Sequence, residues 1–299
     1  MMNIDRSLRS DRIMKSLTGM TVSEFVRFLP AYGEVLSVPG SEKKRLRAPG
    51  AGAKHTLGTP EEKLFFILFY IKCYPTFDVA GFFFDADRSQ PCRWVGTYLP
   101  LLEKTLGKKV VLPERKISSA EEFIRLFPEV REVFADGTER PVQRRKNYEK
   151  QREDYSGKKK RHTRKNIVFT DSGRRILMLT ATEGGRNHDY TLFRESIIPG
   201  HLPAGLNVST DLGFQGIRKD YPHLQVSVPH KKPKGKELTF HQKIQNHITS
   251  SCRVIVENAI CGIKRLKSLT DIYRNKRERL DDIFMNVGCG LWNYHLMAA

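Results

Sequence analysis

Apolar positions in the first third of the chain recur at helical spacing. Over residues 21–38 they return every three or four positions behind a threonine able to cap a helix, which predicts one helix that Pro30 interrupts or kinks. Residues 39–59 mix Gly, Pro, Lys and Arg with few apolar side chains, a composition typical of a linker. At Thr59-Pro60-Glu61-Glu62 a capping residue precedes a proline and two acids, which predicts a new helix start.

Three helices with short turns between them are expected from that start, over residues 60–74, 76–84 and 87–107. This spacing is typical of a helix-turn-helix DNA-binding module. A generic three-helix bundle that serves packing or dimerisation stays open as the alternative, because the third helix is only moderately basic.

The pattern changes to that of a sheet near residue 133. There an apolar run ends abruptly in Asp136, Gly137 and Thr138, which predicts a buried strand that carries Asp136 to the edge of a sheet. Two further β-rich runs flank a turn signal at residues 171–174, so three antiparallel strands are expected. The run that ends in Asp211 repeats the first one, with a glycine two positions later.

Further helices are expected over residues 118–127, 190–196, 237–249, 249–269 and 281–296, and residues 220–235 are expected to be irregular. In 249–269, at ~100° per residue, one stripe holds Ser250, Arg253, Glu257, Cys261 and Lys264, and the apolar side chains Val254, Ile255, Ile260 and Ile263 lie away from it. The last helix is expected to pack across the sheet. Together these patterns predict an α/β (α+β) fold with an N-terminal helix and linker (1–57), a small all-helical domain (58–113) and a mixed-sheet domain (114–299).

The charge of the chain indicates what kind of partner it binds. The formal charge is +19 and the isoelectric point is near 9.8, and the stretch from Arg140 to Lys165 holds twelve Lys or Arg against three acids. Clustered cations of this kind favour a polyanion such as nucleic acid. A membrane is the weaker candidate, because the longest apolar run falls far short of the ~20 residues that span a bilayer. The polar N-terminus shows no signal peptide, so a cytoplasmic location is expected.

Three carboxylates can supply chemistry at such a site: Asp136 and Asp211 at strand ends, and Glu257 on a helix. Mg²⁺ prefers oxygen ligands and takes only a few from protein, which leaves positions for water and phosphate. The competing interpretation of Glu257 is a surface ion pair with Arg253 four residues earlier, which contributes only about 0.3–0.5 kcal/mol. The five cysteines lack the spacing of a disulfide framework or a zinc site.

The motifs around these acids resemble those of DDE transposases of bacterial insertion sequences that carry an N-terminal helix-turn-helix. The similar segments are Phe134-Ala-Asp-Gly-Thr-Glu139, Tyr155-Ser-Gly-Lys-Lys-Lys-Arg-His-Thr163, Ser209-Thr-Asp-Leu-Gly-Phe-Gln-Gly216 and Arg253-x3-Glu257-x6-Lys264. One departure is Ser250, where many relatives have a tyrosine, which puts in doubt any DNA contact that this tyrosine carries. His188-Asp189 also resembles a family motif, for which both a structural role of the imidazole and a role in catalysis stay open.

The resemblance implies a ribonuclease-H-like catalytic domain that binds two Mg²⁺ ions, with Mn²⁺ as a substitute, and cuts and joins double-stranded DNA. It assigns Asp136, Asp211 and Glu257 as metal ligands, with Asp136 shared between the ions. It implies that the residues that contact DNA are Lys158, Lys159, Lys160, Arg161, His162, Arg253, Lys264, Arg88 and Arg93. A homodimer or higher oligomer is expected because two element ends must be brought together, and association with the nucleoid follows.

Two alternatives remain beside this reading. A transposase-derived DNA-binding protein that no longer cuts is compatible with the same motifs, and the basic run 158–161 can be a merely solvated face. A basic RNA-binding protein does not account for two strand-end aspartates together with a helical Glu that is matched by Arg and Lys.

Overall fold

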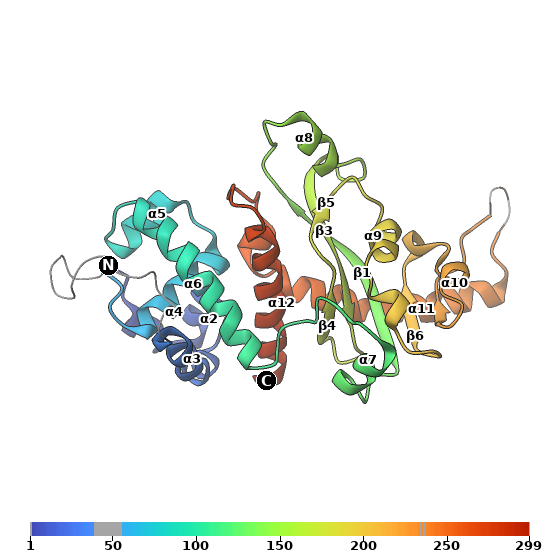
Figure 1. The fold of residues 1–299 in the computed structure, drawn as a ribbon, viewed down its shortest axis with the longest axis horizontal. Helices are drawn as coiled ribbons and strands as arrows, with labels where there is room; N and C mark the ends of the chain where they lie inside the picture. Colours follow the sequence, from blue (N-terminus) through green and yellow to red (C-terminus); the bar gives the residue numbers. More distant parts are fainter. Residues whose placement is uncertain (1, 39–55, 234, 236, 299) are drawn as a thin grey trace. The chain divides into compact units, whose positions relative to one another are not determined.

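The chain folds into two compact units. The computed structural model describes residues 2–38, 56–233, 235 and 237–298, so most of the predicted linker, 39–55, lies outside the described residues. One unit comprises Met1–Leu112, Lys264–Asp271 and Arg277–Ala299, and the other comprises Pro113–Ile263 and Ile272–Lys276. The first unit is helical and the second is built on a mixed sheet, which confirms the predicted α/β class (Figure 1).

Three helices open the first unit: α1 (Ile4–Ser7), α2 (Asp11–Thr18) and α3 (Val22–Ser37). Only α3 was expected from the sequence. It begins in a capping box, in which the Thr21 hydroxyl accepts from the Glu24 amide at 3.0 Å and the Glu24 carboxylate accepts from the Thr21 amide. Of the two effects expected of Pro30, an interruption does not occur, because α3 runs through this residue. A proline removes one backbone hydrogen bond, and the buried apolar face that includes Phe28 holds the helix continuous.

The helix-turn-helix region consists of α4 (Pro60–Cys73), α5 (Phe77–Phe84) and α6 (Ser89–Lys108), as the sequence predicts. Thr59 and Glu62 form a second capping box at the start of α4. Residues 64–71 of α4 are all buried, so α4 is the central helix of this unit. The ring of Phe66 meets Phe84 of α5 and Trp94 of α6 edge-on, with centroids 5.1 and 5.0 Å apart. These contacts fix the three helices around one aromatic core.

The last helix, α12 (Leu280–Ala298), packs on α6 of the first unit. The expectation that it lies across the sheet is therefore wrong. A Cβ added at Gly290 would approach Leu112 to 2.8 Å and Leu106 to 3.1 Å, so glycine allows a close approach at this position. The side chain of Asn293 donates to the Val111 carbonyl at 2.9 Å. Helical periodicity alone does not reveal these specific partners.

The second unit contains a sheet that has seven strands in the described part of the chain, with β3 paired with β1, β2, β4 and β5 and the order β3-β1-β6-β7 along its main path. The strands are β1 (Glu132–Pro141), β2 (Tyr155–Ser156), β3 (Arg161–Thr170), β4 (Ile176–Leu179), β5 (Glu183–Gly184), β6 (Asn207–Thr210) and β7 (Gln225–Ser227). The three antiparallel strands expected from the sequence are β1, β3 and β4. β6 and β7 add two parallel strands, and β7 lies in a segment that was expected to be irregular.

Strand β1 is longer than its apolar run predicts. It pairs with β3 from Phe134 to Pro141, so Asp136 lies within β1, opposite Val168, and not at the end of the strand. The strand edge that the sequence anticipated exists on the other side, because the pairing of β1 with β6 stops at Ala135. Beyond that point, among the described strands, the polar half of β1 pairs only with β3. The alternation of apolar residues in the sequence does not indicate where the pairing with β6 stops.

Helices surround this sheet: α7 (Ala120–Leu126), α8 (Tyr148–Asp154), α9 (Asp189–Glu195), α10 (Ile217–Asp220) and α11 (Phe240–Ile263). The 3-10 turns are η1 (Pro199–His201) and η2 (Leu212–Phe214) in this unit and η3 (Lys267–Leu269) in the first. The two helices expected over residues 237–269 are one helix that ends at Ile263. In the part of the chain that the structure describes, no helix has the length and apolar composition needed to cross a bilayer.

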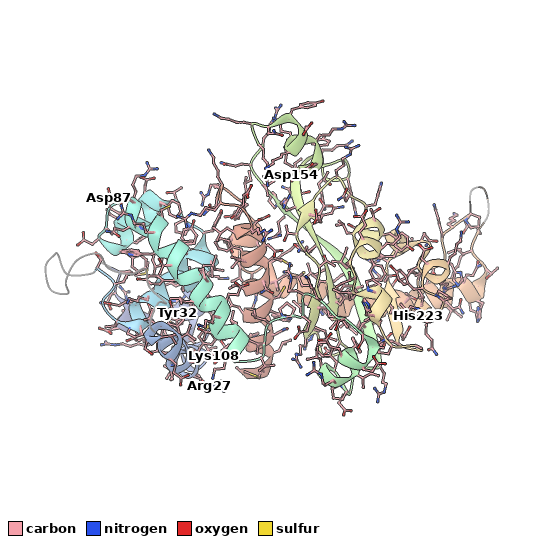
Figure 2. The ribbon with its side chains drawn as sticks, in the orientation of Figure 1. Arg27, Tyr32, Asp87, Lys108, Asp154 and His223 are labelled. Atoms are coloured by element: carbon pink, nitrogen blue, oxygen red, sulfur yellow. The ribbon has the colours of Figure 1, made fainter. Side chains whose placement is uncertain are left out.

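The basic stretch between Arg140 and Lys165 is a structured hairpin rather than a loop. β1 leads into α8, and the chain returns through β2 and β3 (Figure 1). Asp154, at the end of α8 (labelled in Figure 2), is buried and accepts hydrogen bonds from Arg145 at 2.7 Å and Arg164 at 3.2 Å. A buried carboxylate with two arginine partners anchors α8 against the strands.

Candidate active site

Parallel pairing of β1 with β6 makes Asp136 and Asp211 neighbours. The last paired residues are Ala135 and Thr210, and each aspartate is the next residue along its chain. Adjacent strands lie about 4.8 Å apart, so the two side chains begin from adjacent positions. The structure thus brings together the two aspartates that the sequence singled out.

The environment of Asp136 disfavours its charged form. Burial raises the pKa of Asp136 to about 6, and the nearby carboxylates of Asp211 and Asp189 also raise it. A hydrogen bond from the Gly137 amide, at 2.7 Å, and the positive charge of Arg253 lower this pKa in the opposite direction. The site therefore holds negative charge that its own cations offset only in part.

Asp211 is fixed by the turn that follows β6. It caps η2, and its Oδ1 accepts a hydrogen bond from the Gly213 amide at 2.7 Å. A Cβ at position 213 would lie 2.9 Å from that same oxygen. The glycine two residues after the second aspartate therefore lets the backbone approach the carboxylate.

Helix α11 packs against β1, β3 and β6 and presents Arg253 and Glu257. Its buried face includes Val256, Ala259 and Ile263, whereas Val254, which was expected on the core side, is half exposed. Arg253 is close enough to lower the pKa of Asp136 and donates to Glu257 Oε1 at 3.0 Å. α11 therefore places Arg253 near Asp136.

Glu257 binds Arg253 in this structure and does not join the two aspartates. Its side chain is 50% exposed, and the contact is the i, i+4 ion pair that competes with a ligand role. Within the described residues no group of three His, Cys, Asp or Glu is arranged to hold a metal ion. Lys264 follows the end of α11 and belongs to the first unit, so the stripe predicted along one helix is not continuous.

A buried charge cluster beside Asp136 was not anticipated from the sequence. The ammonium of Lys165 lies 3.2 Å from Glu139, 3.0 Å from Asp189 and 2.9 Å from the carbonyl oxygen of Asn187. Burial raises the pKa of Glu139, but Lys165 and a hydrogen bond from Thr163 outweigh this effect and leave it below its ordinary value. Glu139 is thus a partner of Lys165.

Asp189 is the part of that cluster that reaches the site. A Cβ at Gly137 would lie 2.7 Å from the Asp189 carboxyl carbon, so this carboxylate covers the residue after Asp136. The sequence signal for Asp189 was the motif His188-Asp189 at the start of a helix. Only the imidazole of this motif was considered from the sequence. His188 is exposed, and its side chain does not cap α9.

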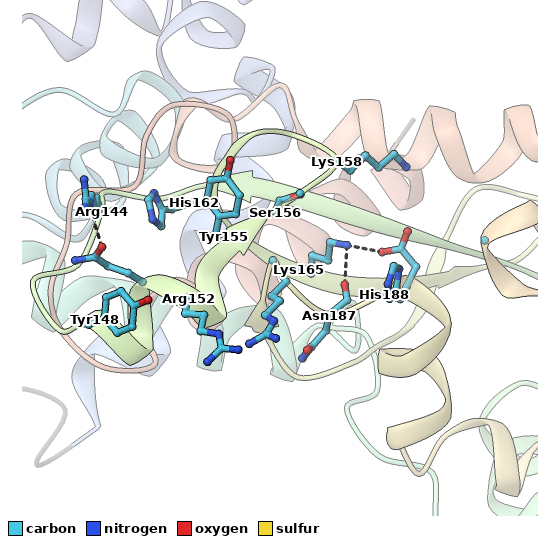
Figure 3. Close-up of a pocket in the computed structure, with 16 residues that line it drawn as sticks. Arg144, Tyr148, Arg152, Tyr155, Ser156, Lys158, His162, Lys165, Asn187 and His188 are labelled. Atoms are coloured by element: carbon cyan, nitrogen blue, oxygen red, sulfur yellow. Dashed lines mark hydrogen bonds and ion pairs between the residues drawn. The ribbon is translucent and has the colours of Figure 1, made fainter.

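A basic groove of about 980 Å³ lies beside the aspartates in the second unit (Figure 3). Its lining comes from α8, the β2–β3 turn, residues 185–189 and Gly213. Lys158 and His162, two of the DNA-binding candidates, are part of it. Lys159 and Lys160 are exposed on the turn between β2 and β3, and Arg161 is exposed at the start of β3. Of the predicted basic run, the structure therefore places Lys158 in the lining of this groove.

Arg88 and Arg93 lie in the first unit, at the start of α6. Arg93 is exposed, and the Arg88 side chain, 70% exposed, lies 3.8 Å from Asp78. A loose, solvated pair of this kind contributes little to stability. Both guanidinium groups are accessible to a partner.

Comparison with known families agrees with this geometry. The model of the DDE superfamily endonuclease matches residues 135–293. The chain belongs to the DDE superfamily of endonucleases. The model of the helix-turn-helix of DDE superfamily endonucleases matches residues 55–108, so α4–α6 are that DNA-binding region. The resemblance to DDE transposases drawn from the motifs is confirmed.

One curated relative extends the match over most of the DDE endonuclease chain. The "Probable transposase for insertion sequence element IS702" of Microchaete diplosiphon is 28% identical over 265 residues, which cover 89% of this chain and 90% of the relative. No solved structure matches the chain. The family match includes both aspartates and Glu257.

The residues present at the DDE site fit a divalent cation in their chemistry. Asp136 and Asp211 supply the carboxylate oxygens that Mg²⁺ prefers. Burial and the nearby charge of Asp211 raise the pKa of Asp136, so its charged form is disfavoured in the absence of a further cation. A bound cation would supply the missing positive charge.

The pH dependence of stability tests this charge balance in metal-free protein. The pKa of Asp136 is about 6 in the folded state, against an ordinary value of 3.8. Between these values the folded state binds more protons than the unfolded state, so the free energy of unfolding falls as the pH rises through this window. At 1.36 kcal/mol per unit the loss is at most about 3 kcal/mol, and partial exposure reduces it to ~1–2 kcal/mol.

We therefore expect Asp136→Asn to be more stable than wild type at pH 7.5 in EDTA, and to lose this advantage at pH 4. Urea unfolding at the two pH values measures the difference. Glu129→Gln, which neutralises an exposed carboxylate on a turn, serves as the matched control and should follow wild type. An Asp136→Asn advantage that is equal at both pH values would contradict the charge balance.

Proposed function

We propose that this protein is a transposase that cuts DNA at the ends of its mobile element and joins the freed 3′ hydroxyl to target DNA. The observation that carries the proposal is the pairing of β1 with β6, which holds Asp136 and Asp211 side by side next to a basic groove. The similarity to a probable transposase of an insertion sequence supports the same activity.

Asp136, Asp211 and Glu257 are the proposed ligands of two Mg²⁺ ions, for which Mn²⁺ substitutes. When bound, the ions would neutralise phosphate charge and activate the attacking oxygen. Glu257 completes this set when its carboxylate leaves Arg253 and becomes a metal ligand. The guanidinium of Arg253 then binds a phosphate oxygen, a partner suited to its planar fork.

The helix-turn-helix region is proposed to bind the terminal inverted repeats. Double-stranded DNA is then the partner of both units, and a homodimer or higher oligomer brings two ends together. The proposed place of action is the nucleoid in the cytoplasm. The domain assignment 58–113 and 114–299 remains the sequence-based proposal for how binding and catalysis are divided.

A DNA-binding protein that no longer cuts is the second candidate. The observation that favours it is the ion pair between Glu257 and Arg253, which gives the third acid a partner other than a metal ion. One outcome distinguishes this candidate from the main proposal. If the protein no longer cuts, the wild-type chain binds element ends but leaves them intact in Mg²⁺.

Strand cleavage tests the three acids. The substrate is a labelled duplex that carries the element end, found from the inverted repeats flanking the gene, incubated with Mg²⁺. Asp136→Asn, Asp211→Asn and Glu257→Gln should each lower the cleavage rate by at least ~100-fold, as expected for the loss of a group that organises charge in the transition state. Glu129→Gln is the control with full activity. Unchanged cleavage in any one acid variant would remove that residue from the site.

The salt dependence of binding tests the helix-turn-helix region. Arg88→Ala/Arg93→Ala should weaken binding to the element end and lower the slope of log K against log salt by up to ~2, because each phosphate contact contributes about 0.9. Lys15→Ala, which removes an exposed lysine of α2, controls for net charge. An equal slope in the double variant and in wild type would exclude both arginines from the interface.

The basic run is tested in the same way but on a different DNA. A quadruple Ala variant of Lys158, Lys159, Lys160 and Arg161 should flatten the salt slope by up to ~4 on nonspecific duplex, since phosphate contacts carry no sequence information. Fluorescence anisotropy at several salt concentrations measures it. A wild-type slope would identify the run as a solvated face.

A further inference from the structure

The basic groove carries two aromatic rings that face solvent. Tyr148, at the start of α8, is 75% exposed, and Tyr155, on β2, is 42% exposed; both line the groove (Figure 3). The ring of His162 lies edge-on to Tyr155, with centroids 5.6 Å apart. A single exposed aromatic residue needs no explanation, but two in one charged groove form a surface with a defined chemistry.

Cations surround these rings. Arg152, Lys158 and Arg186 line the groove and are exposed, and they make no ion pair within the described part of the chain. Lys165 is the exception, because Glu139 and Asp189 neutralise it. A positive groove with exposed aromatic rings is the arrangement by which proteins hold single strands, with phosphates on the cations and bases stacked on the rings.

The frame of the groove is rigid. Buried Asp154 ties the end of α8 to Arg145 and Arg164, and Arg144 donates to Gln151 of α8 at 2.9 Å. A Cβ at Gly184 would overlap the Glu153 carbonyl oxygen, so β5 lies directly against the end of α8. Rings held on such a frame lose little entropy when a ligand stacks on them.

The size of the groove suits a short piece of a strand. Pockets of about 300–1,000 Å³ enclose ligands of small-molecule size. A volume of about 980 Å³ therefore admits a few nucleotides.

The groove opens onto the two aspartates. Two of its lining residues, Asp189 and Gly213, lie against Gly137 and Asp211 respectively. We infer that this groove binds unpaired nucleotides of the DNA strand beside the cleavage position, with bases stacked on Tyr148 and Tyr155 and phosphates on Arg152, Lys158 and Arg186. The position of the strand relative to the cut rests on the proposed function, whereas single-strand binding itself does not.

The test compares two DNAs on the full chain in EDTA, where no cleavage occurs: a blunt duplex, and the same duplex with a single-stranded tail of about four nucleotides. Stacking contributes ~1–3 kcal/mol per base, so the tail should tighten binding by at least about tenfold. Tyr148→Ala/Tyr155→Ala should abolish this preference and leave blunt-duplex affinity unchanged. Tyr148→Phe/Tyr155→Phe should keep it, because phenylalanine retains the ring.

Phe240→Ala is the matched control, since it removes an aromatic residue that is 80% exposed on α11 and does not line the groove. Equal binding of both DNAs by wild type, a preference that survives in the double alanine variant, or an equal loss of blunt-duplex binding would overturn the inference. Tighter binding of an RNA tail than of the DNA tail would also overturn it. A wild-type chain that prefers the tail but never cuts in Mg²⁺ would refute the proposed function and leave the groove assignment intact.

Discussion

The burial of Asp136 beside a second carboxylate, Asp211, is the constraint on which the site depends. Backbone hydrogen bonds between β1 and β6 hold Ala135 opposite Thr210, so the aspartates that follow them begin from adjacent backbone positions. Burial strengthens the repulsion between the two carboxylates because it removes screening water. The pairing therefore stores unfavourable electrostatic energy at one edge of the fold, where a polyanion and its cations are to be bound.

The protein offsets this energy with partners that do not occupy the site. The Gly137 amide donates to Asp136, and Arg253 approaches from α11. Lys165 neutralises Glu139 and Asp189, so the two further acids near β1 do not add their full charge. Gly137 has a specific function in this arrangement, because a side chain there would displace the Asp189 carboxylate. The Gly137 amide and Arg253 thus reduce the cost of holding the aspartates together, whereas Asp189 adds to it.

Local signals in the sequence predicted most helices and strands. Where those predictions failed, tertiary packing determined the structure. Capping residues such as Thr59, Thr76 and Ser119 placed helix starts within a residue or two, since a cap acts on its own first turn. Pro30 does not interrupt α3, because a buried face outweighs one lost hydrogen bond. The partner of α12 could not be read either, because periodicity shows that a face is apolar but not which surface covers it. Asp136 and Asp211 were predictable because each follows a strand-like run. For Glu257 the sequence left two partners open, a metal ion and Arg253, and the structure shows the ion pair with Arg253.

The groove was hidden from the sequence by its own composition. Between Arg140 and Lys165 twelve cations outnumber three acids, a ratio that indicates a solvated or DNA-binding surface and draws no attention to two tyrosines. The position of Asp154 distinguishes a solvated surface from a folded groove. Asp154 is buried and takes up Arg145 and Arg164, which folds the segment back on β3 and leaves other cations beside the tyrosine rings. Glu149 and Glu153 are exposed and impose no such fold. The pattern of charge alone could not distinguish these three acids, because burial depends on strands that are separated from them in the chain.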